Sequence, residues 1–290
     1  MSVHSRYRAG LWHPYEKPMY GVLLNPYHPL ARGLVGCWLF NEGGGNIVYD
    51  LSGFMNHGTL GGGTAGYCPS WITGKFGSVL SFDGSDDYVD IGDTGQDAYA
   101  IELCFCTSTT INPSTSGTTL IQLHYLGGSG QGVIGLGSVT GFLDDEVISL
   151  LDRYEGVYTR TGVCNITINP GWHHLVLTYN PNSANYYDFW LDSTKQTTTA
   201  GSQGAINRIQ PASEVLIGKD KAVDYNFFGD LISFVRIYNR SLNADEIFQL
   251  HVDPFCMFYH PLEAELLYAA APPVGIVPQA MHHYRMLREV

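Results

Sequence analysis

The stretch that most constrains the fold is residues 33–58, where two short apolar runs each end in turn-forming residues. The first run is followed by three consecutive glycines at residues 43–45, and the second ends at Asp50 before a Ser-Gly pair. Apolar runs of strand length that are bounded by Gly, Asp and Ser are typical of β-strands. We therefore expect residues 33–58 to form two strands that open a β-sandwich.

The rest of the chain continues this pattern up to about residue 250. The 290 residues include 34 Gly, 19 Tyr and 13 Phe, which favour strands and turns over helices. A sandwich of this size can be one domain with a sizeable core. We expect an extended arm over residues 1–32, a sandwich domain over residues 33–251 and a docking tail over residues 252–290. The strands are expected at residues 78–82, 87–91, 99–107, 118–126, 171–179, 186–192, 215–218 and 231–238.

Local signals refine this prediction at several points. An Asp83-Gly84 pair joins two alternating runs, which predicts a hairpin with Asp87 and Asp90 facing water. His173 and His174 are neighbours on a strand and so point to opposite faces, with one of them partly buried and structural. Asn243 and Glu246 are spaced as a capping box, which predicts a helix that runs to about residue 251.

Charge and cysteine content exclude several classes of function. The formal net charge of −12 offers no basic stripe for nucleic acid, and no run approaches the roughly 20 apolar residues of a membrane span. The six cysteines form no Cys-x-x-Cys pair, so we expect mostly buried free thiols. Residues 1–8 are not followed by an uninterrupted apolar stretch, so we expect no signal peptide.

Two further motifs are more readily explained as ordinary structure. The Gly-x-Gly-x-x-Gly at residues 130–135 is not followed by a helix pattern, which a dinucleotide site requires. Three adjacent acids at residues 144–146 could hold a hard cation, but a solvated hairpin tip is the simpler interpretation. Neither motif therefore predicts a site.

Taken together, nine motifs resemble the laminin-G-like, concanavalin A-like lectin and glucanase superfamily, in order and spacing, across residues 33–250. Each motif is weak alone and their joint occurrence is specific. They are residues 33–42, 49–53, 56–58, 74–77, 80–84, 87–89, 172–174, 235–240 and 242–247.

The resemblance implies an all-β fold, a two-sheet antiparallel jelly-roll sandwich with one short C-terminal helix and extended arms at both ends. It also implies a structural calcium near a sheet edge, carried over to Glu42, Asp50, Asn56 and Asp230. Ser233 and Phe234 stand where relatives often have an acid, which removes one ligand. The alternative is that Asp50 only caps the turn at residues 51–53.

The superfamily includes glycosidases and lectin-like modules, and the chain lacks the paired acids of the enzymes. Neither Glu-x-Asp-x-Glu nor Glu-x-Asp-x-x-Glu occurs. We therefore expect no catalysis. If sugars bind, aromatic faces stack on the rings and acids take the hydroxyls. The candidates are Tyr154, Tyr158, Tyr186, Tyr187, Asp188, Trp190, Asp224 and Tyr225, each of which could equally serve core or rim packing.

The two flanks resemble those of lectin-like proteins from tailed bacteriophages. Their aromatic and proline-rich sequences suggest either straps on the domain or arms for assembly. The leading hypothesis is a non-catalytic virion protein that decorates a capsid or tail, is made in the host cytoplasm and forms a homo-oligomer. Its partners would be capsid or tail proteins and cell-surface glycans. The alternatives are a glycoside hydrolase with this fold and a bacterial carbohydrate-binding or adhesion module.

Overall fold

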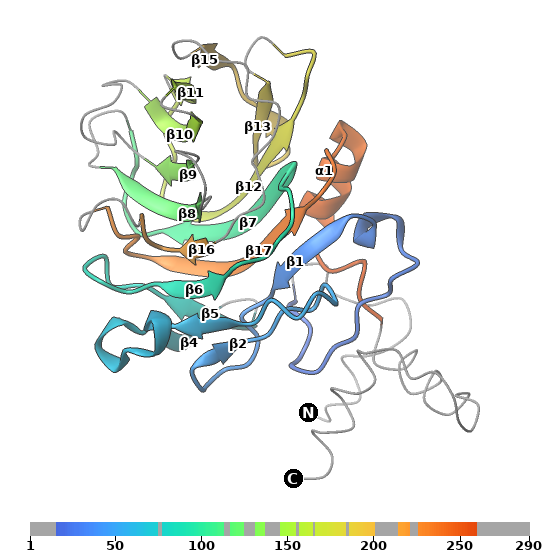
Figure 1. Cartoon of the computed structure of the whole chain (residues 1–290), viewed down its shortest axis with the longest axis vertical. Coiled ribbons are helices and arrows are strands. Elements are labelled where there is room, and N and C mark those ends of the chain that lie inside the picture. Colours follow the sequence, from blue (N-terminus) through green and yellow to red (C-terminus); the bar gives the residue numbers. More distant parts are fainter. Residues whose placement is uncertain are drawn as a thin grey trace.

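The computed structural model is a sandwich of two antiparallel sheets with one short helix, α1 (Ala244–Val252), beside the first sheet (Figure 1). The all-β jelly-roll prediction is thereby confirmed. The structure describes residues 16–74, 77–112, 117–124, 131–136, 146–154, 157–164, 166–183, 186–200, 214–220 and 226–259. Within these residues, no helix is long and apolar enough to cross a membrane.

The first sheet has eight strands in the order β14-β13-β12-β7-β17-β5-β4, with β1 also paired to β17. Neighbours in this order are antiparallel. The strands are β1 (Leu34–Trp38), β4 (Ser70–Gly74), β5 (Gly77–Ser81), β7 (Ala100–Thr107), β12 (Gly171–Tyr179), β13 (Tyr187–Leu191), β14 (Thr194–Lys195) and β17 (Leu231–Tyr238).

The second sheet has nine strands in the order β15-β11-β10-β9-β8-β16-β6-β3-β2. Its strands are β2 (Ile47–Val48), β3 (Gly58–Leu60), β6 (Val89–Gly92), β8 (Thr118–His124), β9 (Gln131–Leu136), β10 (Glu146–Tyr154), β11 (Val157–Cys164), β15 (Thr198–Ala200) and β16 (Glu214–Ile217). Three short 3₁₀ turns, η2 (Pro29–Ala31), η3 (Gly61–Gly63) and η4 (Ala65–Tyr67), and helix α1 (Ala244–Val252) complete the described elements.

The main core lies between the two sheets and follows the period-two alternation of the strands. The first sheet contributes Leu103, Phe105, Leu175, Leu177, Val235 and Ile237, and the second contributes Val89, Ile91, Ile121, Leu123, Val215 and Ile217. The opening stretch places β1 in the first sheet and β2 in the second, which confirms that it contributes two strands.

The prediction of a hairpin at Asp83 and Gly84 is wrong. The strand before the turn, β5, belongs to the first sheet, and the strand after it, β6, belongs to the second. Gly84 has a φ of 77° and lies against Gly229, where a Cβ would be 3.2 Å from the Gly229 Cα. Asp87 is buried, not solvated, and its Oδ2 accepts a hydrogen bond from the Asp83 amide. The Asp-Gly pair makes a tight turn, but the chain after it crosses to the second sheet.

A second apolar cluster covers the outer face of the first sheet. Helix α1 contributes Ile247 and Leu250 to it, and Val176 and Phe234 come from the sheet below. The helix begins as predicted: the Asn243 side chain accepts from the Glu246 amide, and the Glu246 carboxylate accepts from the Asn243 amide. This apolar cover turns the outer face of the first sheet into a second buried layer.

The terminal segments belong to the same outer layer. Leu24 forms a β-bridge with Phe258, and the Asn25 amide donates to the Met257 carbonyl over 2.9 Å. Both segments therefore act, in their described parts, as straps on their own domain. Residues 1–15 and 260–290 lie outside the described part of the chain, so an assembly role for them stays a prediction.

The outer layer encloses an ion pair between Glu102 and Arg236, in which Arg236 Nη1 lies 2.7 Å from Glu102 Oε1. Both side chains are fully buried. His174 Nε2 lies 3.1 Å from the same carboxylate oxygen, and Arg236 Nη2 donates to the Pro254 carbonyl. Burial raises the pKa of Glu102, but the guanidinium and His174 outweigh that effect, so the net pKa lies below its usual value.

The histidine prediction is also confirmed. His174 is buried on the outer face beside Glu102, whereas His173 lies on the other side of β12 against the Phe105 ring, with ring centroids 5.7 Å apart. The cysteine prediction is confirmed only in part: the five cysteines of the described structure are free thiols, but only Cys37 is fully buried and the other four are partly exposed. The side chain of Cys164 lies outside the described residues.

We expect Arg236→Met to lower the free energy of unfolding by about 3–5 kcal/mol, because it leaves the Glu102 carboxylate buried without its cation. Urea denaturation measures this loss. Lys195→Met removes the cation of a more exposed ion pair and should cost less than about 1 kcal/mol. Equal midpoints for the two variants would contradict a structural role for the buried pair.

The N-terminal strap gives a pH-dependent prediction through Lys17. Its Nζ donates to the carbonyls of Phe40, Ser78 and Ser233, and burial lowers the pKa of the ammonium group to about 7. The unfolded chain therefore binds more protons than the folded chain between pH 7 and 10.5, so stability rises with pH in that window.

We expect the free energy of unfolding to increase by about 1 kcal/mol per pH unit between pH 7 and 9 relative to Lys17→Met. Above pH 9 the thiols of Cys37 and Cys104 act in the opposite sense, because burial raises their pKa to about 12. Denaturation at half-unit steps gives the two slopes. Parallel slopes for wild type and Lys17→Met would refute the assignment to Lys17.

Candidate functional site

An open cleft of about 540 Å³ lies between the β12–β13 hairpin and the start of helix α1. The two walls come from segments about 60 residues apart in the chain, and the Thr178 hydroxyl joins them by donating to the Leu242 carbonyl over 3.2 Å. The lining includes Tyr179, Asn180, Asp188 and Trp190 from the hairpin, and Arg240 and Glu246 from the opposite wall.

The hairpin turn fixes Asp188 at the edge of the cleft. The Asn180 amide donates to the Tyr186 carbonyl over 2.7 Å, which closes the turn. The Asn180 side-chain amide then donates to Asp188 Oδ2 over 2.8 Å, and Lys195 Nζ lies 2.8 Å from the same oxygen. Within the described residues both contacts use Oδ2, which leaves Oδ1 as an acceptor.

Trp190 supplies the aromatic surface of the cleft. It pairs with Val176 across β12 and β13, and its ring packs against the outer apolar cluster while also lining the cleft. Its Nε1 is buried and has no hydrogen-bond partner among the described residues. The Tyr179 ring takes the other face of the sheet: it packs against the main core and makes edge contacts with Tyr99 and Tyr187 at centroid distances of 5.7 and 5.6 Å. Trp190 is thus the aromatic side chain on the outer side of the cleft, and the outer cluster holds its ring in place.

The opposite wall is built around Arg240. Its guanidinium contacts both carboxylate oxygens of Glu246 at 2.9 Å and donates to the Arg32 carbonyl over 2.6 Å. Burial raises the pKa of Glu246, but Arg240 and the Asn243 amide outweigh it, so the net pKa lies below its usual value and the carboxylate stays ionised.

The structure brings two of the eight predicted carbohydrate-binding residues, Asp188 and Trp190, to one cleft. Tyr187 is buried, and Tyr186 packs partly against the main core at the hairpin turn. Tyr154 and Tyr158 lie on the paired strands β10 and β11, and their side chains lie outside the described residues, as do Asp224 and Tyr225.

The sequence analysis did not identify the other lining residues as members of a site, among them Tyr179, Asn180, Arg240 and Glu246. Glu246 was identified as a capping residue and Arg240 as part of a family motif. No local pattern signals that the capped helix start faces the β12–β13 hairpin, because that contact depends on the order of strands in the sheet.

The side chains of the four predicted calcium ligands make hydrogen bonds within the protein. Asp50 accepts from the Cys37, Ser52 and Asn56 amides and from the Ser52 hydroxyl at 2.7–3.1 Å, which agrees with the turn-capping alternative. Glu42 accepts from the Tyr49 amide, and the Asn56 side-chain amide donates to the Val35 carbonyl. Asp230 accepts from the Ser108 amide and hydroxyl in another part of the fold.

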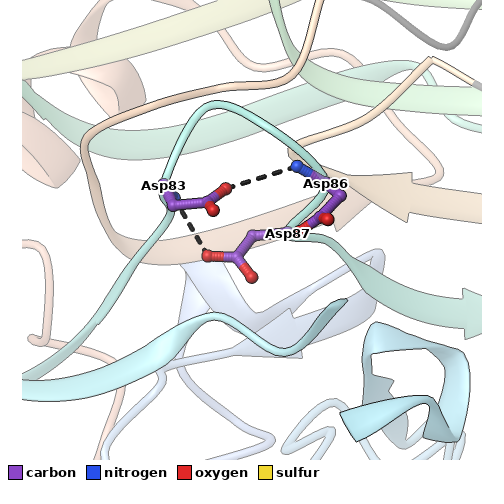
Figure 2. Close-up of side chains that lie close together, drawn as sticks. All are labelled: Asp83, Asp86 and Asp87. Carbon is purple, nitrogen blue, oxygen red and sulfur yellow. Dashed lines mark hydrogen bonds between the residues drawn. The ribbon is translucent and has the colours of Figure 1, made fainter. Parts of the chain in front are cut away.

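In the described residues, three carboxylates lie close together elsewhere, on the loop that crosses between the sheets. Figure 2 shows Asp83, Asp86 and Asp87, whose carboxylate oxygens lie within 4.8 Å of one another. Asp83 Oδ1 accepts from the Ser85 and Asp86 amides, and these bonds lower its pKa. Such bonds account for the geometry as a self-capped loop, so calcium stays a prediction.

Solved structures with similar folds include sugar-binding domains. Domain 4 of AbnA, an extracellular GH43 arabinanase from Geobacillus stearothermophilus solved with arabinotriose, is 17% identical with a TM-score of 0.52, over 75% of this chain and 98% of that one. The botulinum neurotoxin serotype D binding domain is 10% identical with a TM-score of 0.51, over 78% of this chain and 52% of that one.

The binding domain of botulinum neurotoxin DC in complex with SialylT is 13% identical with a TM-score of 0.50, over 77% of this chain and 52% of that one. The chain thus spans about half of the toxin binding domains. At these identities the likeness establishes the fold alone. Comparison with curated protein sequences finds no match.

A family model described as the concanavalin A-like lectin/glucanases superfamily matches residues 83–248. This span is more than half of the chain, and it runs from the loop that crosses the sandwich to the helix that walls the cleft. The match agrees with the sheet order and with the motifs found in the sequence. The chain therefore belongs to the concanavalin A-like lectin/glucanase superfamily.

Proposed function

We propose that this protein is a non-catalytic, lectin-like module that binds glycans in the cleft between the β12–β13 hairpin and helix α1. The observation that carries the proposal is the position of Trp190 beside Asp188 and Asn180 in a cleft of about 540 Å³. Ligand sites are commonly concave, with apolar lining and a few fixed polar groups, and this volume lies within their usual range.

The chemistry of the wall suits a sugar. An indole ring offers an apolar face to the C–H groups of a sugar ring, while a carboxylate accepts from hydroxyl groups and an amide can both donate and accept. Asp188 is held by Asn180 and Lys195, so its free oxygen is positioned before a ligand arrives. Preorganised polar groups lower the cost of binding. The similar arabinanase domain, solved with arabinotriose, supports this proposal by analogy.

The acids of the cleft favour binding over hydrolysis. A glycosidase needs a carboxylic acid with a raised pKa as proton donor and a second carboxylate across the scissile bond. Glu246 has the opposite property, because Arg240 lowers its pKa, and it also caps the helix. Asp188 is engaged by an amide and an ammonium group. A glycoside hydrolase remains the alternative, and its acid pair would have to lie elsewhere.

The proposal extends to a place on a phage virion, as a homo-oligomer that decorates the capsid or tail. It rests on the resemblance of the two flanks. In their described parts, paired through Leu24 and Phe258, the flanks pack on their own domain and add no support of their own. A bacterial adhesion module is the other candidate from the same observations.

We expect the protein to copurify with intact particles through density-gradient centrifugation. Immunoblotting of the gradient fractions against the major capsid protein measures this association. Recovery of the protein only in the particle-free fractions would refute the virion placement and leave glycan binding untouched.

We expect a broad glycan array to show binding that Trp190→Ala weakens by about 30-fold, the equivalent of about 2 kcal/mol for loss of an aromatic anchor. Asp188→Asn should weaken the same binding while preserving the side-chain shape.

The matched control is Phe248→Ala, which removes an exposed aromatic ring on helix α1 that does not line the cleft. Circular dichroism checks that each variant folds. Binding that all three variants retain would place the site elsewhere.

A further inference from the structure

We propose that the cleft selects neutral glycans and excludes sialylated, carboxylated and sulfated ones. This inference rests on the proposed function and adds the chemical class of the ligand. Its basis is that Arg240, the cation that lines the cleft, is already held by protein acceptors, whereas Asp188 keeps one carboxylate oxygen free of contacts within the described residues.

Arg240 is the only cation among the residues that line the described cleft. A guanidinium has five N–H donors. Nε donates to the Arg32 carbonyl, Nη1 to the Ser241 carbonyl and to Glu246, and Nη2 to the Pro29 carbonyl and to Glu246. Four of the five donors thus have close acceptors within the protein, and the fifth faces the Pro29 carbonyl at 3.4 Å, so no pair of free donors remains for the bidentate contact that an arginine makes with an anionic ligand.

The start of helix α1 also lines the cleft, and a helix start without a cap attracts anions through its free amides. The capping box occupies this end: Asn243 accepts from the Glu246 amide and Glu246 accepts from the Asn243 amide. The first turn also carries the acids Asp245 and Glu246. The capping box thus satisfies two of the amides at the helix start and places carboxylates beside them, which disfavours an anionic sugar at this end.

Asp188 places a carboxylate on the opposite wall of the cleft. Its ammonium partner, Lys195, is not among the cleft-lining residues, so a ligand meets the carboxylate first. Lys195 at Oδ2 offsets part of this charge, but Oδ1 has no hydrogen to donate to a ligand carboxylate or sulfate, whereas a ligand hydroxyl can donate to it. The net charge of −12 on the whole chain adds a longer-range repulsion of anionic glycans.

The experiment uses an array on which each neutral glycan has a sialylated and a sulfated counterpart, with lactose and 3′-sialyllactose as the pair followed by calorimetry. We expect at least tenfold weaker binding of the anionic member of each pair. Equal or tighter binding of the anionic member would overturn this inference and leave glycan binding in place. Binding of neither member of any pair would overturn the proposed function, and this inference with it.

A pair of variants tests the physical cause. Glu246→Gln releases Arg240 from its carboxylate partner, while glutamine can still complete a capping box. We expect the ratio of neutral to anionic affinity to fall about tenfold. Asp245→Asn removes the same charge from the same turn at a residue outside the cleft lining, and should change the ratio by less than about twofold. Equal changes in both variants would show that net charge, and not the occupied guanidinium, sets the selectivity.

Discussion

The buried ion pair of Glu102 and Arg236 is the interaction on which the outer layer of this protein depends. Both residues lie on the face of the first sheet that points away from the main core, where water would normally solvate them. Helix α1 and the two straps cover this face, so the charges must be satisfied within the protein. Arg236 reaches the Pro254 carbonyl, and His174 approaches Glu102 from β12. The pair therefore links the sheet to the segment that covers it.

This outer layer also positions the cleft. With α1 seated on the sheet, its first turn faces the β12–β13 hairpin, and the bond from Thr178 to the Leu242 carbonyl holds the two together. Arg240 extends the same layer by binding the Arg32 and Pro29 carbonyls of the strap. The capping box at the helix start and the acceptors around the Arg240 guanidinium are thus structural contacts. Because they engage Arg240, they also determine which charges a ligand can meet in the cleft.

Several residues show how far local patterns reach. Alternation correctly placed Val89 and Ile91 in the core and His173 and His174 on opposite faces, because a strand alternates its side chains whatever it pairs with. The Asp83-Gly84 pair correctly signalled a turn but not its destination, since β5 pairs with β17 and β4 whereas β6 pairs with β16 and β3. Asp50 shows a similar limit: an acid before a turn can bind a cation or backbone amides, and only the neighbouring Cys37 and Asn56 amides show how it is used here.

The sequence by itself indicated the strands with clear apolar alternation, the opposite faces of His173 and His174, the capped helix and the likeness to the superfamily, all of which depend on residues close together in the chain or on motifs in order. It did not indicate β4, β9, β10, β11, β14 or β15. Only the tertiary structure decided that Asp188 and Trp190 share a cleft with Arg240 and Glu246, and that Glu102 meets Arg236 across 134 residues. The physical reason is that strand order and helix docking set these contacts. Periodicity fixes the face on which a side chain lies but not what lies opposite it.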